Sequence, residues 1–219
     1  MAVPTALPLF PLGSVLVPGL VLPLHVFEHR YQVLVQALMA LPEDAVRVFG
    51  VVAIRSGRDV GTDGARALYS IGCTAELRDV TPLDDGRFDI VSVGQARFRL
   101  NGLDAGAGTP YHTGMVDFLN EPDGEADTDN LALAVAARFT AYRARLGAQP
   151  TEMPDDPRVL SYLVAAATLL DLPDRQALLE RPTTSERLEL ELALLRRELT
   201  LIDAFNAVPG VELASNPGN

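Results

Sequence analysis

The spacing of apolar residues divides the chain into two parts with different periodicities. From about residue 7 to residue 118, apolar and polar residues mostly alternate, which is typical of β-strands. The clearest predicted strand covers 69–77, and its apolar face carries Tyr69, Ile71, Cys73, Ala75 and Leu77. A turn over 82–86 and a returning strand over 87–93 predict a hairpin. The first part is therefore expected to be rich in β-structure.

One helix and one fully buried strand are also predicted in this part. Apolar residues recur at helical spacing over 28–40, and the segment 46–54 is apolar enough for a strand buried on both faces. Gly94 interrupts the next strand, so we expect a β-bulge or a close approach of backbone there. Beyond it, Arg97 and Arg99 share a polar face. Exposure to solvent is the preferred interpretation of that face, and binding of a carboxylate or an acidic partner is the alternative.

A polar, acidic loop over 120–130 separates this part from a second one with helical periodicity. Four helices are predicted: over 131–146 with Asp129 as N-cap, from Pro157 with Asp155 or Asp156 as N-cap, from Pro173 to Pro182, and from a Thr183–Glu186 capping box to about Asn206. The apolar stripes of the first two contain Leu131, Val135, Phe139, Tyr142 and Leu146, and Leu160, Leu163, Val164 and Ala167. The last helix carries a heptad seam of Leu188, Leu192, Leu195, Leu199 and Ile202. This seam is expected to form the core of a bundle, with a dimer interface as the alternative.

The first 27 residues carry no Asp, Glu, Lys or Arg and have the hydropathy of a membrane span or a signal peptide. Five prolines interrupt every possible helix of the roughly 20 residues that spanning requires: Pro4, Pro8, Pro11, Pro18 and Pro23. The stretch is therefore predicted to form short buried extended segments, with a turn at Pro18-Gly19. A cytoplasmic protein without membrane contact is the expectation.

The composition argues against several classes of function. The chain has 29 acidic and 18 basic residues and a formal net charge of −11, which disfavours nucleic acid as a partner. The sequence contains no lysine, so mechanisms that need a Schiff-base lysine, a Ser–Lys dyad or a phosphate-loop lysine are excluded. A single cysteine cannot form an internal disulfide or a cysteine-based metal site.

Residue types that carry chemistry do not assemble into a catalytic motif. His25 and His29 are four residues apart, but His25 precedes the predicted helix, so a capping or surface role is preferred to metal ligation. Cys73 falls on the apolar face of its strand, which predicts a buried, unreactive thiol. Glu28 and Arg30 fit a helix N-terminus and its polar contacts, with a polar pair in a binding site as the alternative. No cofactor and no metal is expected.

Several segments resemble, in order and spacing, the Lon protease N-terminal domain, also called the Lon substrate-binding domain. The opening signature at 7–31 is LPLFPLGSVLVPGLVLPLHVFEHRY. It is followed by FGVVAIRSG at 49–57, GCTAELRDVTPLDDGRFDIVSVGQARFRL at 72–100 and PY at 110–111. The helical part continues the resemblance with LSYLVAAATLLDLPDRQALLE at 160–180 and RLELELALLRREL at 187–199. The resemblance thus covers about residues 7 to 206.

This resemblance implies an α+β fold, with an N-terminal PUA-like β pseudo-barrel that contains one inserted helix and a C-terminal α-helical bundle with a long last helix. It implies a β-rich subdomain over 1–118, an acidic linker over 119–130 and a helical bundle subdomain over 131–219. In the full protease this region helps to recognise unfolded or tagged substrates and contributes to assembly, while the ATPase and the peptidase are separate domains. The chain is therefore expected to resemble a stand-alone, non-enzymatic protein.

The implied function is binding of unfolded or extended polypeptide, as an adaptor or holdase, with a protease or chaperone as a possible further partner. A small-ligand or RNA-binding module is the alternative, and the acidic net charge weakens the RNA version. A homodimer is left open. The family supplies no short set of binding residues, so the candidates for peptide contact are drawn from the N-terminal signature and the polar strand face: Phe10, Leu12, Val26, Phe27, Glu28, Arg30 and Arg97.

Overall fold

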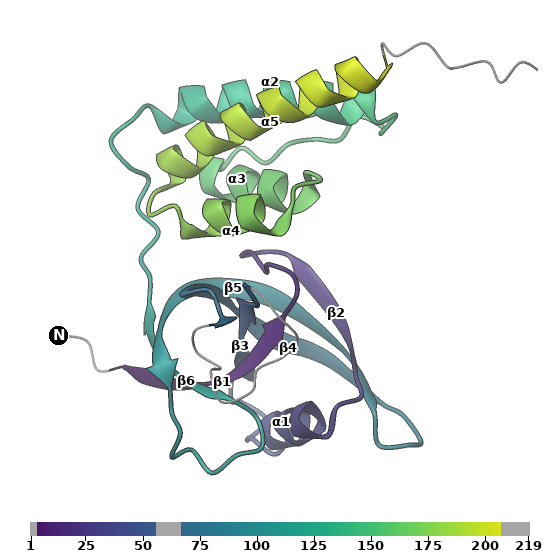
Figure 1. Ribbon diagram of the computed structural model, residues 1–219, viewed down its shortest axis with the longest axis vertical. Coiled ribbons are helices and arrows are strands. Elements are labelled where there is room, and N and C mark those ends of the chain that lie inside the picture. Colours follow the sequence, from purple (N-terminus) through teal and green to yellow (C-terminus); the bar gives the residue numbers. More distant parts are fainter. Residues whose placement is uncertain (1–3, 56–66, 207–219) are drawn as a thin grey trace, which may run out of the picture.

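The computed structural model describes residues 4–55 and 67–206, which form a β-barrel and a helical bundle stacked on each other (Figure 1). The barrel contains β1 (Thr5–Leu12), β2 (Val21–Val26), α1 (His29–Met39), β3 (Val48–Ala53), β4 (Ile71–Pro82), β5 (Phe88–Leu103) and β6 (Thr113–Phe118). The bundle contains α2 (Thr128–Arg145), α3 (Pro157–Ala167), α4 (Leu172–Glu180) and α5 (Thr184–Asn206). The expected α+β class, with one helix among the strands and a long last helix, is confirmed.

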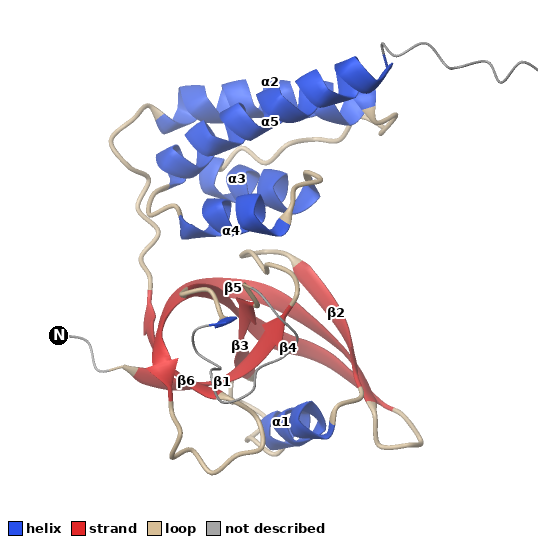
Figure 2. Cartoon of the chain, viewed as in Figure 1, coloured by secondary structure: helices blue, strands red, loops and turns tan. Residues whose placement is uncertain are grey.

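The sheet closes because β5 is long enough to pair with three neighbours. The strand order is β2-β5-β4-β3-β1-β6, and an additional pairing between β5 and β6 closes the barrel while β2 stays outside the closed ring (Figure 2). The first residues of β5 pair with β2 and the last with β6, while β4 runs antiparallel beside most of its length. Among the strand pairs of the described residues, β1 and β3 alone run parallel. Closure leaves β2 as the strand at the free edge of the sheet, where its proline, Pro23, is tolerated.

Apolar side chains fill both faces of the barrel strands. On one face α1 contributes Tyr31, Leu34, Val35 and Leu38, and the Tyr31 ring stacks on Phe10 with the ring centroids 3.9 Å apart. A second cluster on the strands comprises Leu7, Leu9, Val52, Leu68, Phe98 and Val116. The alternation expected over 69–77 is therefore wrong in part: Gly72 and Thr74 are as buried as Cys73, since both faces of β4 are covered there.

The bundle packs on the barrel through a third apolar cluster. The bundle's own core joins Phe139 and Tyr142 of α2 to Leu160 of α3 and to Leu188 and Leu195 of α5. A separate cluster combines Val15, Val17, Ala53 and Ile71 of the barrel with Tyr162, Ala165, Leu178, Leu179 and Leu194 of the bundle. This apolar contact fixes α3 and α4 against the top of the barrel (Figure 1). How the chain divides into domains stays a prediction.

Details of the helices differ from the sequence-based expectation in a few places. The N-cap of α2 is Asp127 rather than Asp129, because the Asp127 carboxylate accepts from the backbone of Asn130 at 3.1 Å. Asp156 caps α3 and Thr183 accepts from the backbone of Glu186, both as predicted. The apolar stripe of α3 is rotated: Tyr162 and Ala165 are buried while Leu163 and Ala167 are exposed, because α3 packs on the barrel as well as on α5. Leu146 is exposed at the end of α2. Within the described residues, no helix is long and apolar enough to cross a membrane.

Candidate functional site

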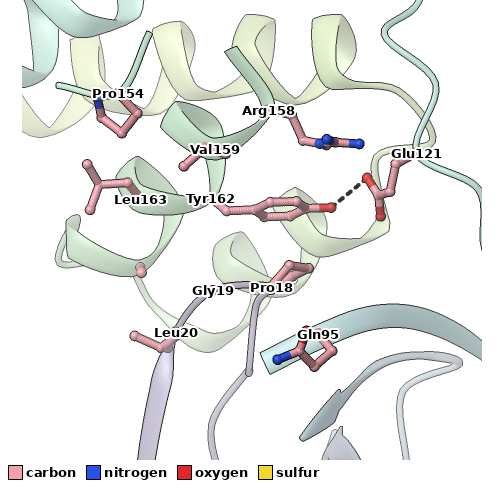
Figure 3. A pocket seen from close by; sticks show the side chains of 11 residues that line it. Pro18, Gly19, Leu20, Gln95, Glu121, Pro154, Arg158, Val159, Tyr162 and Leu163 are labelled. Atoms are coloured by element: carbon pink, nitrogen blue, oxygen red, sulfur yellow. Dashed lines mark hydrogen bonds between the residues drawn. The ribbon is translucent and has the colours of Figure 1, made fainter. Parts of the chain in front are cut away.

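A groove of about 380 Å³ lies where the barrel meets the bundle (Figure 3). The barrel wall consists of the turn before β2 and one residue of β5, and the bundle wall consists of α3 and the segment before it. Glu121, from the segment between β6 and α2, closes one end. The residues that line the groove are Pro18, Gly19, Leu20, Gln95, Glu121, Pro154, Arg158, Val159, Tyr162, Leu163 and Ala166. Most of this lining is apolar, and its polar groups lie at the edges.

The bundle wall is formed by a face of α3 that its own core does not cover. Asp156 accepts hydrogen bonds from the backbone of Arg158 at 2.8 Å and of Val159 at 3.1 Å, so α3 begins beside the groove. One helical turn further on, Leu163 lies beneath Val159. Their side chains are exposed, at 50% for Val159 and 38% for Leu163. Exposed apolar residues gathered on one face are typical of a binding surface.

The barrel wall depends on a close contact between a turn and a glycine. Gly19 has a φ of 81°, as the predicted Pro18-Gly19 turn requires. Its amide donates to the carbonyl of Gly94 at 2.8 Å, and the Gly94 amide donates to the carbonyl of Leu20 at 2.9 Å. A Cβ at Gly94 would overlap the carbonyl oxygen of Val17. The close backbone approach expected at Gly94 is thus confirmed, and a break in the β4–β5 register lies beside it.

Glu121 joins the barrel to the bundle at the end of the groove. One carboxylate oxygen accepts from Nε of Arg97 in β5 at 2.5 Å, and the other accepts from the Tyr162 hydroxyl in α3 at 2.8 Å (Figure 3). The Arg187 guanidinium of α5 stands 3.9 Å from the same carboxylate and covers the Tyr162 ring at 3.9 Å. Burial is the main cause that raises the pKa of Tyr162, which therefore stays a neutral donor.

Arg97 is buried, so the expectation of a solvated strand face is wrong for this residue. Its guanidinium donates to the carbonyl of Leu179 at 2.9 Å and to that of Arg181 at 2.5 Å, in addition to Glu121. These two carbonyls belong to the last turn of α4 and its C-cap, where helical backbone lacks internal partners. The bundle covers this face of β5 and supplies the acceptors, whereas Arg99, two residues on, stays exposed.

A second buried arginine and a buried acid lie behind the groove on α5. Nε of Arg187 donates to the Ser161 hydroxyl at 2.7 Å. Glu191, one helical turn further on, is 1% exposed, and neither of its carboxyl oxygens has a hydrogen-bond partner within the described chain. Burial raises the pKa of Glu191 well above its usual range and lowers that of Arg187.

Comparison with known proteins identifies the family. A family model described as "ATP-dependent protease La (LON) substrate-binding domain" matches residues 6–197. The chain belongs to this family. Lon protease 2 of Myxococcus xanthus is 31% identical over 218 residues, and Lon protease of Escherichia coli K12 is 26% identical over 204 residues. These alignments cover 94% and 90% of this chain and 25% of each relative, so the chain spans about a quarter of the length of these curated relatives.

Solved structures of Lon N-terminal domains share the fold. A Lon N-terminal domain protein from Xanthomonas campestris is 26% identical, with a TM-score of 0.63, and the match covers 86% of this chain and 98% of that one. The N-terminal domain of Mycobacterium avium complex Lon protease has a TM-score of 0.65 at 17% identity, covering 88% and 98%. The second match supports the fold alone. The match to the family model is to its substrate-binding domain and not to an ATPase or peptidase domain.

The residues chosen from the Lon signature mostly gather elsewhere, near the N-terminus of α1. Phe10, Leu12, Val26, Phe27 and Glu28 line a second hollow of about 270 Å³. Of these, Phe27 is 63% exposed and Val26 is buried. Arg30 pairs with Glu28 at 2.8 Å and stacks over the Tyr31 ring. Arg97 is not part of this hollow but of the joint with the bundle. Whether this second hollow binds polypeptide stays a prediction.

The cysteine and the two neighbouring histidines lie apart from the groove. Cys73 is fully buried, and burial raises the pKa of its thiol to about 12. His25 lies on β2 and contacts Asp89 at 2.6 Å, while His29 begins α1. Among residues 4–55 and 67–206, no three metal-ligating side chains cluster together.

Sequence reasoning missed the groove residues Gln95, Glu121, Arg158 and Tyr162. The sequence around these residues does not indicate a binding site. Glu121 is one of several acidic residues in its loop, and Tyr162 is one of many apolar residues on α3. Arg187 and Glu191 are four residues apart, a spacing that ordinarily indicates an exposed helix pair. The one available signal was Gly94, whose predicted close approach marks the barrel wall of the groove.

Proposed function

We propose that this Lon substrate-binding domain binds extended, partly apolar segments of polypeptide in the groove between its barrel and its bundle, and that it performs no chemistry on them. The groove supports this proposal, because its wall presents Val159 and Leu163 to solvent beside Pro18 and Leu20. A strip of apolar side chains open along its length suits an extended chain better than a folded surface. Membership of the substrate-binding family and the Lon proteases among its relatives support polypeptide as the ligand class.

The binding is expected to be weak, in the micromolar range or above. A groove of about 380 Å³ accommodates only a few side chains, and a flexible polypeptide must be ordered when it binds. Because apolar contact dominates, moderate salt is expected to change the affinity little. Weak, salt-tolerant binding of unfolded chains fits a holdase, or an adaptor that passes polypeptide to a protease or chaperone.

A fluorescence titration tests the proposal directly. The probe is a labelled polypeptide kept unfolded by reduction and alkylation, compared with the same polypeptide in its native fold. The unfolded form is expected to bind at least tenfold more tightly. Leu163→Glu places a charge in the groove without disturbing the core and is expected to weaken binding about tenfold, the equivalent of about 1.4 kcal/mol for part of one leucine contact.

The matched control is Leu133→Glu, which introduces the same charge at an exposed leucine of α2 outside the groove. This variant is expected to bind like the wild type. Equal binding of folded and unfolded probe, or equal loss in both variants, would count against polypeptide binding in the groove. Incubation with ATP and with casein tests the absence of chemistry, and turnover that co-purifies with the protein would contradict it.

A small organic ligand is the second candidate. The volume of the groove lies within the roughly 300–1,000 Å³ of small-molecule sites, and such sites are also apolar with a few polar groups. A ligand that saturates the protein and competes with the unfolded probe, with an affinity that polypeptides do not reach, would favour this candidate.

A further inference from the structure

Gln95 occupies the one position of β5 where the strand is irregular beside the groove. Gly94 pairs with Ala75 and Arg97 pairs with Cys73, so Gln95 and Ala96 together oppose the single residue Thr74. The Thr74 hydroxyl accepts from the Ala96 amide at 3.0 Å and donates to the Ala96 carbonyl at 3.2 Å. These two hydrogen bonds with the Thr74 side chain take the place of the backbone hydrogen bonds that Ala96 would otherwise make to β4. Gln95 is the extra residue of a β-bulge, a feature that redirects a side chain.

The Gln95 side chain is exposed and lines the groove below Pro18 (Figure 3). The amide group of this side chain has no hydrogen-bond partner within residues 4–55 and 67–206. A primary amide donates and accepts at once, which matches the N–H and C=O groups of a peptide backbone. The bulge therefore directs toward the apolar groove a group that is complementary to extended backbone of any sequence.

Arg158 faces the groove from the opposite wall, near its Glu121 end (Figure 3). Its guanidinium makes no hydrogen bond within the described chain, and it forms a long ion pair with Asp156, 4.0 Å away, in which both side chains are about half exposed. At that end Glu121 is already paired with Arg97 and Tyr162. Because this ion pair is long and exposed, the N–H groups of Arg158 can still donate to a carbonyl oxygen, whose partial negative charge the guanidinium complements.

We propose that Gln95 and Arg158 bind the backbone of the polypeptide in the groove, one from the barrel and one from the bundle. This inference rests on the proposed function and deepens it. Gln95 pairs with the N–H and C=O of one residue, and Arg158 donates to a carbonyl further along. Apolar side chains of the bound segment contact Leu20, Val159 and Leu163. The ligand class is therefore an extended segment with free backbone amides and apolar side chains of variable identity.

Synthetic peptides separate backbone contacts from side-chain contacts. The parent is an eight-residue peptide of leucine and serine with both termini blocked, and the derivatives carry a methyl group on one backbone nitrogen at a time. At one or two positions, methylation is expected to weaken binding about threefold to tenfold, the range of one neutral hydrogen bond. A methyl group removes an N–H donor and leaves every carbonyl, so it tests the pairing with Gln95.

Two variants complete the test. Gln95→Leu is expected to weaken the parent peptide about threefold to tenfold and to have a smaller effect on the sensitive methylated peptide, because the two changes remove the same contact. Arg158→Met is expected to weaken both peptides by the same factor, since the carbonyl that it binds is unchanged. Gln36→Leu, at an exposed position of α1, is the control and is expected to bind like the wild type.

The outcomes distinguish this inference from the proposed function. If the parent binds, Leu163→Glu weakens its binding, and neither methylation nor Gln95→Leu changes it, backbone recognition by Gln95 is refuted while polypeptide binding stands. If only a peptide with a free terminal carboxylate binds, Arg158 is an anchor for a chain end and the inference is also refuted. If no peptide binds the wild type, the proposed function itself fails.

Discussion

Replacing Arg97 tests whether the joint between barrel and bundle depends on one buried side chain. Arg97→Met keeps a long, flexible apolar side chain and removes the guanidinium. The variant loses the ion pair with Glu121 and the donors to the carbonyls of Leu179 and Arg181. Methionine is long enough to fill much of the space, so the change acts chiefly on polar contacts.

The expected loss of unfolding free energy is about 3–5 kcal/mol. Removing one partner of a buried ion pair has an effect of this size, because the remaining groups stay buried without compensation. The two α4 carbonyls lose their donor, and each unpaired buried group costs about 1–3 kcal/mol. Water and the remaining contacts of Glu121 with Tyr162 and Arg187 offset part of the sum. A loss of this size is a large fraction of the 5–15 kcal/mol that stabilises a typical domain.

Urea unfolding followed by circular dichroism measures the effect, and Arg99→Met is the matched control. Arg99 lies two residues along the same strand and is exposed, so its replacement is expected to change stability by less than about 0.5 kcal/mol. Should Arg97→Met not fold, Arg97→Lys gives the measurement. Lysine keeps the charge but cannot present the planar fork, and an intermediate loss is expected. An Arg97 variant as stable as the wild type, or one no worse than Arg99→Met, would refute the reasoning.

Three further predictions concern single sites. Gly94→Ala is expected to lose about 2–4 kcal/mol in urea unfolding, because its Cβ overlaps the Val17 carbonyl and displaces the turn that lines the groove, whereas Gly102→Ala, with no atom near its Cβ, should be neutral. Cys73 is expected to react slowly with a thiol reagent at pH 8 and fast in denaturant, since burial raises its pKa to about 12; fast native labelling would contradict this. The folded chain binds the Glu191 proton more tightly than the unfolded chain. The contribution of Glu191 to stability should therefore fall as the pH rises above about 4.3, and Glu191→Gln should gain stability relative to the wild type between pH 5 and pH 8. Parallel urea midpoints across that range would refute the last expectation.

The elements of the fold were predictable because local chemistry decides them. Asp156 and Thr183 accept hydrogen bonds at helix N-termini, as their types and positions indicated. The α1 residues at helical spacing are buried, and the long last helix contributes Leu188 and Leu195 to the bundle core. Each of these features depends on residues within one or two turns of sequence, so it is readable without tertiary information.

The groove was not predictable, because its residues come together only through tertiary packing. The alternation along β5 places Arg97 and Arg99 on the same face of the strand. No local pattern, however, indicates that α4 covers Arg97 and leaves Arg99 exposed. The exposed face of α3 was not predictable for the same reason. Tyr162 and Leu163 are neighbouring apolar residues in the sequence, and only the position of the barrel decides that Tyr162 is buried and Leu163 is exposed. Phe10, Val26 and Phe27 lie within the Lon signature, and they line a different hollow.

The polar contacts at the joint explain why the groove has a defined width. The apolar cluster that includes Ile71 of the barrel and Leu178 of the bundle stabilises the joint, but apolar contact is not directional and tolerates small displacements. The bonds of Arg97 to Glu121 and to the α4 carbonyls require one relative orientation, because hydrogen bonds weaken steeply with angle. Gln95 and Arg158 stand on opposite walls, so their separation depends on that orientation. We infer that the contacts of Arg97 fix the separation of the two walls, and that under the proposed function Arg97→Met therefore weakens peptide binding even in conditions where it stays folded.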